Sequence, residues 1–183
     1  MTSAMAPYDS LIAPALAAGA AKATVIRAED VVVSSVFRDI CAGNACGMYG
    51  RCWMCPPDIG EIDVLMARLK GYGHGLLYQT IHAIEDSFDI EGMGEASVRH
   101  ARVSQAVNDA LRPLLPGCLH LSCGGCHLCG RCAKMDNQPC RHPDRALPPM
   151  EGYGIDVYNT TRLTDLKYIN GQNTVTFFGL VLF

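Results

Sequence analysis

The residues with the clearest potential for chemistry are cysteines, which recur at every third position from Cys123 to Cys132 and again at Cys140. In a Cys-x-x-Cys-x-x-Cys run, three thiolates can converge on one cuboidal iron–sulfur cluster, with a more distant cysteine as the fourth ligand. A tetrahedral zinc site more often uses two Cys-x-x-Cys knuckles that lie well apart. The spacing therefore favours an iron–sulfur cluster over zinc, and it leaves open which three consecutive cysteines belong to the set.

A second group lies earlier in the chain, with an irregular spacing of four, five and two residues between its cysteines. Glycines separate these cysteines, which indicates a loop wrapped around a bound group. Pro56 and Pro57 follow directly, and a proline fixes the exit of the chain and removes a competing amide donor. We expect all four cysteines to bind one cluster, since the last two share a Cys-x-x-Cys spacing. They are Cys41, Cys46, Cys52 and Cys55.

Composition places the chain among ordinary globular proteins, with 49% hydrophobic and 18% charged residues. Its 183 residues predict a single domain that spans 1–183. The net charge of -3 and the lack of a basic stripe argue against nucleic-acid binding. The apolar run 11–21 follows Asp9 rather than basic residues and is too short to cross a bilayer. We therefore expect a soluble cytoplasmic protein with reduced thiols.

Hydrophobic periodicity predicts helices and strands in alternation along the chain. Asp58 and Glu61 have the spacing of a capping box for a helix with apolar positions at 62, 65, 66 and 69. The apolar positions 31–33 and 36–37 fit a strand or a helix, and His82 inside a strand has no predicted role. We expect an α/β or α+β sandwich. The predicted helices lie within 9–19, 62–69, 95–114 and 158–166, and the predicted strands cover 23–27, 76–84, 119–121 and 174–183.

Three blocks of this sequence resemble a prokaryotic family catalogued as predicted metal-binding proteins. They are Cys41-x4-Cys46 with Trp53 and Cys55-Pro56-Pro57, then Cys126-x2-Cys129-x2-Cys132 with Cys140-Arg141-His142-Pro143, and the run from Met150-Glu151 to Val157. The resemblance implies metal binding without naming a reaction. It also implies that Cys126, Cys129, Cys132 and Cys140 form the later set and that Cys123 is an extra. In the family, the position of Cys52 need not be a cysteine.

Three functions follow from these patterns. The leading hypothesis is a protein with two [4Fe-4S] clusters that transfers electrons to a redox partner protein. The alternative is an enzyme in which only Cys41, Cys46 and Cys55 bind the first cluster, so that one iron stays open to a substrate. A further alternative is a structural zinc protein. The position of Cys52 separates the first two hypotheses, and we expect it to complete the first cluster.

Overall fold

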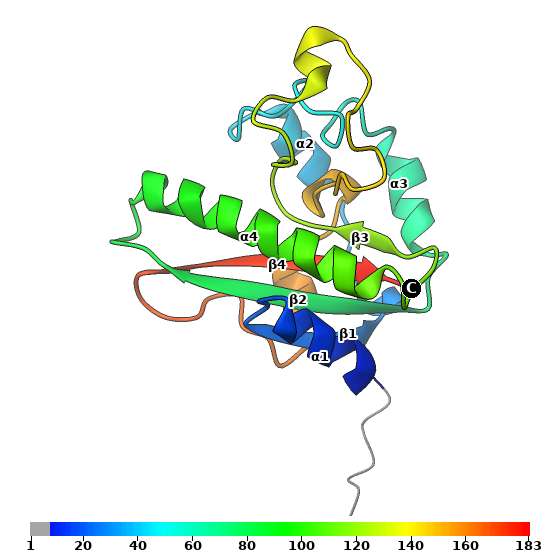
Figure 1. The fold of residues 1–183 in the computed structure, drawn as a ribbon, viewed down its shortest axis with the longest axis vertical. Coiled ribbons are helices and arrows are strands. Elements are labelled where there is room, and N and C mark those ends of the chain that lie inside the picture. Colours follow the sequence, from blue (N-terminus) through cyan, green and yellow to red (C-terminus); the bar gives the residue numbers. More distant parts are fainter. Residues whose placement is uncertain (1–7) are drawn as a thin grey trace, which may run out of the picture.

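Strands from distant parts of the chain form one antiparallel sheet in the computed structural model, which describes residues 8–183 (Figure 1). The first seven residues of the predicted domain lie outside this described part. The strand order is β1-β2-β4-β3, so β4 lies between β2 and β3 although it comes last in the sequence. This interior position explains why β4 is apolar on both faces. The strands are β1 (Lys22–Arg27), β2 (His74–Ala83), β3 (Leu119–Leu121) and β4 (Thr174–Leu182).

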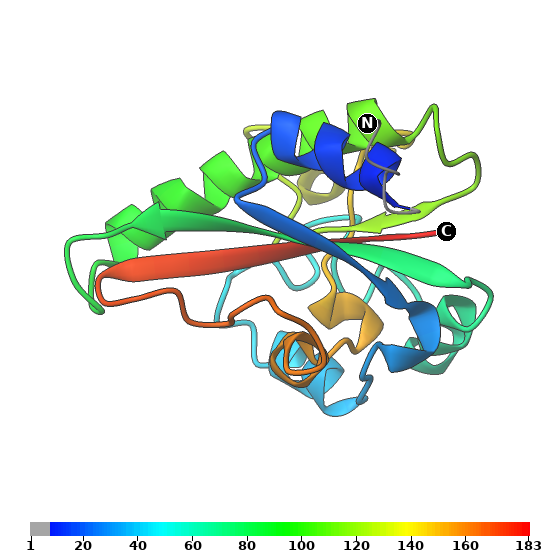
Figure 2. The ribbon, with the colours of Figure 1, turned by 90° about the horizontal axis from the view of Figure 1, so that it is seen from below.

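One face of the sheet is covered by two helices, α1 (Asp9–Ala17) and α4 (Ile90–Leu111) (Figure 2). Side chains alternate between the two faces of a strand, so every second residue of β2 and β4 points toward these helices. The residues buried between this face and the helices are Leu76, Tyr78 and Val181 from the sheet, Leu11 and Ala15 from α1, and Val107 and Leu111 from α4.

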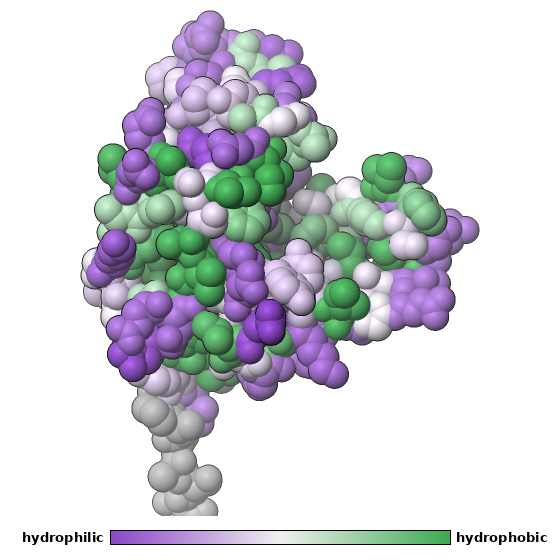
Figure 3. Space-filling view, turned by 180° about the vertical axis from the view of Figure 1, so that it is seen from behind, coloured by the Kyte–Doolittle hydropathy of each residue, from purple (hydrophilic) through white to green (hydrophobic). Residues whose placement is uncertain are grey.

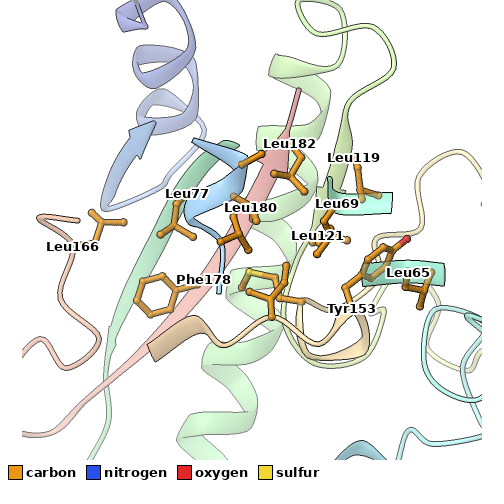
Figure 4. Packing of buried hydrophobic residues seen from close by; sticks show 14 residues of the cluster. Leu65, Leu69, Leu77, Leu119, Leu121, Tyr153, Leu166, Phe178, Leu180 and Leu182 are labelled. Carbon is orange, nitrogen blue, oxygen red and sulfur yellow. The ribbon is translucent and has the colours of Figure 1, made fainter. Parts of the chain in front are cut away.

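The other face carries a second core that packs against α3 (Ile62–Leu69) and α5 (Val157–Thr161). Helix α2 (Val36–Ala42) has no buried residue and lies farther out, against the segment Glu151–Tyr153. Figure 4 shows Leu77, Phe178, Leu180 and Leu182 of the sheet packed with Leu65 and Leu69 of α3 and with Tyr153. Tyr153 ends a short 3-10 helix, Glu151–Tyr153. The sheet therefore has helical segments on both faces, and the predicted α+β class is confirmed.

A chain of polar side chains lies buried between the sheet and α4. The hydroxyl of Tyr78 lies 2.8 Å from both Ser104 Oγ and His120 Nε2, and His100 Nδ1 lies 2.8 Å from Thr80 Oγ1. Burial lowers the pKa of His100 to about 4 and that of His120 to about 3. Both rings are therefore neutral at neutral pH, and every ring nitrogen in this chain has a hydrogen-bond partner within the core.

Three local predictions were wrong. Helix α4 begins at Ile90 rather than 95, because the Asp89 carboxylate accepts a hydrogen bond from Gly92 N–H at 2.7 Å and caps it early. Helix α5 ends at Thr161 rather than 166. The capping box is absent, since Glu61 precedes α3 without a side-chain cap and Asp58 pairs with Lys134 instead. Of the segment that fitted either a strand or a helix, 31–33 forms neither and carries only an isolated bridge from Val33 to Ile155, whereas 36–37 begin α2.

The surface is hollowed between the body of the molecule and the projecting end of β2 and β4, as the view from behind shows (Figure 3). Near this end the side chains of Phe88 and Ile90 are 86% and 82% exposed. No helix among residues 8–183 has both the length and the apolar character needed to cross a membrane.

Candidate metal centre

Regular elements anchor both cysteine loops at their ends. The first loop leaves α2, whose last turn contains Cys41, and reaches the start of α3 at Ile62. The second loop leaves β3 and returns beside it, because Ser122 N–H donates to Pro148 O and Met150 N–H donates to Ser122 O, both at 2.8 Å. Between these anchors the second loop contains only a 3-10 helix, Ala133–Asp136. The loops therefore have fixed bases and irregular interiors.

The two loops contact each other directly. Trp53 Nε1 of the first loop donates to Gln138 O of the second at 2.8 Å. Lys134 forms an ion pair with Asp58, and its ammonium lies 4.4 Å from the centre of the Trp53 ring. These contacts place the two cysteine groups side by side.

Three of the four early cysteines line a first cavity, of about 250 Å³. Burial raises the pKa of the Cys41 thiol, and the negative charge of Glu151 raises it further. The pKa of Cys55 is also raised, mainly because its thiol hydrogen-bonds to Cys52. The walls of the first cavity are largely apolar. Its lining includes Cys41, Cys46, Cys55, Phe37, Ile40, Met48, Pro56, Pro149 and Glu151.

Glu151 brings a carboxylate to this first cavity. Its oxygen Oε2 is buried and has no hydrogen-bond partner. Burial raises the pKa of Glu151, and hydrogen bonds from the backbone N–H groups of Glu151 and Gly124 oppose that rise. The guanidinium of Arg38 lies near Cys41, but its Nη2 donates to Gly60 O at 2.8 Å and to Gly152 O at 3.1 Å. The first cavity thus offers three thiols and one carboxylate oxygen.

A second cavity, of about 20 Å³, is lined by all four cysteines of the later set and by Cys52. Cys52 is fully buried. Its sulfur receives hydrogen bonds from the Cys55 thiol, from Cys126 N–H and from the Cys132 thiol. The Cys55 hydrogen bond is the main reason that the pKa of Cys52 falls to about 6, against the effect of burial. The structure therefore places Cys52 with Cys126, Cys129, Cys132 and Cys140, and away from Cys41 and Cys46.

The remaining cysteines line neither of these cavities. Cys118 borders a separate cavity of about 480 Å³ together with Arg68 and Arg112. Cys123 follows Ser122 at the base of the second loop, and burial, then the charge of Glu151, raises its pKa. All ten cysteines are free thiols.

The donor set in each cavity consists of side chains that bind metals in proteins. Among residues 8–183 no three His, Cys, Asp or Glu side chains converge closely enough to hold a single metal ion. In a cluster, each ligand binds a different iron atom, so the thiols need to surround a volume rather than meet at one point. Five cysteines line one cavity, and three cysteines with one carboxylate line the other.

Sequence reasoning missed Glu151. It lies in the third block of the family resemblance, where an acidic residue follows the segment Leu147-Pro148-Pro149-Met150, but it was not predicted to lie beside the cysteines. Glu151 reaches the cysteines through a contact between segments that lie far apart in the sequence, because the 3-10 helix Glu151–Tyr153 packs against α2.

Comparison with known proteins supports a metal-binding role. The model of a family described as predicted metal-binding proteins (DUF2284) matches residues 24–183, which include both cysteine groups and Glu151. No curated protein and no solved structure matches the chain.

Proposed function

Because this chain belongs to the family of predicted metal-binding proteins, we propose that it binds two [4Fe-4S] clusters and transfers electrons between them and a redox partner. One observation carries the proposal: two sets of free thiols line two cavities that adjoin through the Cys52–Cys55 hydrogen bond. Clusters so close together would exchange electrons by short hops.

The second cavity would be the closed site, with Cys126, Cys129, Cys132 and Cys140 as thiolate ligands. Its volume of about 20 Å³ is close to the space of one water molecule. Cluster binding therefore requires the second loop to move outward. The interior of the loop is largely irregular, so this movement need not break a strand or an α-helix, although contacts such as that between Trp53 and Gln138 O would have to adjust.

The residues around the second cavity limit contact with water and fix the loop. Trp53 and Leu128 line it with the cysteines. Arg131 pairs with Asp136 at 2.7 Å, and Arg141 Nη1 donates to Arg131 O at 2.9 Å. These arginines add positive charge near the thiolates, which offsets part of the negative charge of a cluster. When bound, a cluster would supply one-electron chemistry at a potential set by this environment.

The decisive experiment is metal and sulfide analysis of protein purified without oxygen, together with EPR spectroscopy after reduction. We expect about eight irons per chain, since two four-iron clusters are proposed. Stoichiometric zinc without iron would replace this proposal with a structural zinc protein. About four irons per chain would restrict the proposal to a single cluster.

A second candidate function is an enzyme that activates a small substrate at the first cluster. The position of Cys52 favours it, because only Cys41, Cys46 and Cys55 contribute thiols to a first cavity of about 250 Å³. An iron without a thiolate ligand can act as a Lewis acid toward a substrate atom. In this case the second cluster would deliver electrons to the first.

A further inference from the structure

We propose that the carboxylate of Glu151 is the fourth, displaceable ligand of the first cluster. This inference rests on the proposed function, because it assumes that a cluster binds in the first cavity. It assigns a role to the one acidic side chain that lines this cavity together with Cys41, Cys46 and Cys55.

The backbone holds Glu151 firmly at the cavity wall. Met150 is fully buried, and its carbonyl accepts hydrogen bonds from Tyr153 N–H at 3.0 Å and Ile155 N–H at 3.1 Å. Gly154 has a φ of 74°, and a Cβ at this position would lie 2.9 Å from Ser34 O, so the tight turn that follows Glu151 requires glycine. A side chain on such a fixed backbone can serve as a ligand with little further loss of conformational freedom.

Backbone N–H groups of Glu151 and Gly124 donate to the Glu151 carboxylate, but one of its two oxygens has no partner. Its oxygen Oε2 is buried without a hydrogen-bond donor. Arg38 is the cation beside Cys41, yet its Nη2 donates to two backbone carbonyls, and no ion pair with Glu151 occurs within residues 8–183. Buried charges are usually paired or bound to a metal. A metal ligand is the role that would satisfy Oε2.

Cys52 is the competing fourth ligand, and its surroundings point to the other cavity. Its sulfur receives hydrogen bonds from Cys126 N–H and the Cys132 thiol, both in the second loop. Cys52 also does not line the first cavity, whereas Glu151 does. Three thiols and one carboxylate match the four irons of a cubane.

A carboxylate would make the first cluster different from the second. Oxygen ligands suit harder ions than thiolates do, so a carboxylate binds an iron of such a cluster less tightly. A substrate or small ligand with a sulfur or nitrogen donor could then displace it inside the first cavity. Oxygen also donates less electron density than sulfur, which raises the reduction potential of the cluster. Electrons would therefore flow from the second cluster to the first.

The test compares Glu151→Cys, Glu151→Gln and Cys52→Ser with the unmodified chain, all purified without oxygen. Iron content and redox-titrated EPR spectra are measured, with and without added cyanide as the probe ligand. We expect the unmodified chain and Cys52→Ser to respond to cyanide at one cluster. Glu151→Cys should lose this response and shift that cluster to a lower potential. Glu151→Gln should keep its iron, and cyanide should bind more tightly than to the unmodified chain.

Each other outcome has a distinct meaning. If the unmodified chain contains no iron, the proposed function fails, and the role of Glu151 fails with it. If the chain contains iron but both Glu151 variants give its unaltered spectra and potentials, only the role of Glu151 is wrong. If Cys52→Ser creates the cyanide response, Cys52 is the fourth ligand. Circular dichroism of each variant establishes that it folds, and the two Glu151 variants provide independent readings of the same position.

Discussion

The first and second cavities are built from the same pair of loops, yet they differ in volume, donors and walls. The first measures about 250 Å³ and combines three thiols with one carboxylate and an apolar lining. The second measures about 20 Å³ and has five cysteines around it. The regularly spaced cysteines thus give the tight cavity, and the irregularly spaced ones give the roomy cavity. The regular spacing of the later cysteines therefore agrees with their shared cavity, while the fold decides how open each cavity is.

A close contact between the loops separates the two cavities. Met48 of the first loop packs against Gly125 of the second, where a Cβ would lie only 2.6 Å from the terminal carbon of Met48. Met48 lines the first cavity, and the next cysteine after Gly125, Cys126, lines the second. Glycine at 125 allows this approach, because it removes the side chain that would push the loops apart.

The largest expected effect comes from removing a proposed ligand of the second cavity. Cys129→Ser should lose about half of the iron, because it removes a ligand from one of two four-iron clusters. The first cluster should remain, since Cys129 does not line the first cavity. Iron analysis and EPR of the anaerobic protein measure this. Cys118→Ser is the matched control and should keep all iron, because Cys118 borders neither cavity. Loss of all iron from Cys129→Ser would show that the sites do not form independently.

How far the sequence predicts this site is clearest at Cys52 and Glu151. The grouping of Cys126, Cys129, Cys132 and Cys140 around one cavity agrees with their spacing and with the family resemblance. Cys52 shares a Cys-x-x-Cys spacing with Cys55, but its thiol lies with the second group. Local spacing shows which sulfurs can reach one cluster, whereas their direction depends on loop packing. Glu151 is brought to the first cavity by tertiary contacts, so local spacing does not predict its position beside the cysteines.

In the fold as well, local patterns predicted the elements that they determine and failed where long-range contacts decide. Strands β1, β2, β3 and β4 were predicted closely because their hydrophobic patterns are strong. The start of α4 was missed because Gly92 and Gly94 suggested a loop, while the cap from Asp89 outweighs their low helix propensity. The capping box at Asp58 failed because its carboxylate pairs with Lys134 from a distant loop. Long-range partners overrode local signals in this case.

A second prediction concerns the pH dependence of stability and tests whether both cavities depend on the core around His100. The pKa of His100 is lowered to about 4, so the unfolded chain, with a histidine pKa near 6.5, binds protons first as the pH falls. The stabilisation is complete above about pH 6.5 and is lost between about 6.5 and about 4. The loss is on the order of 3 kcal/mol, since each pKa unit corresponds to about 1.4 kcal/mol.

Denaturant unfolding at a series of pH values measures this change in free energy. His100→Gln serves as the comparison, because its side chain remains polar but no longer titrates. This variant is less stable at neutral pH and should show a flatter pH dependence. If the core supports both cavities, iron should leave both together as stability falls. Iron that leaves one cavity alone, at a pH where the fold is intact, would mean that acid acts on the thiolates of that cavity directly.

The smallest expected effect concerns the contact between the loops. Trp53→Phe removes the hydrogen bond to Gln138 O and weakens the interaction with the Lys134 ammonium. We expect a loss of about 1 kcal/mol in the free energy of unfolding. Hydrogen exchange should increase around Gln138 more than around Cys41, because Trp53 lines the second cavity and not the first. An equal increase in both loops would indicate that they open as one unit.

The position of β4 also governs when these sites can form during synthesis of the chain. Strand β3, which leads into the second cysteine loop, lies at an edge of the sheet and pairs with β4. Both cysteine groups leave the ribosome before β4, because synthesis proceeds from the N-terminus. Until Thr174–Leu182 has emerged, β3 has no strand to pair with and the base of the second loop is unsupported. The base of the second cavity is therefore completed late in synthesis, after both cysteine groups have been made.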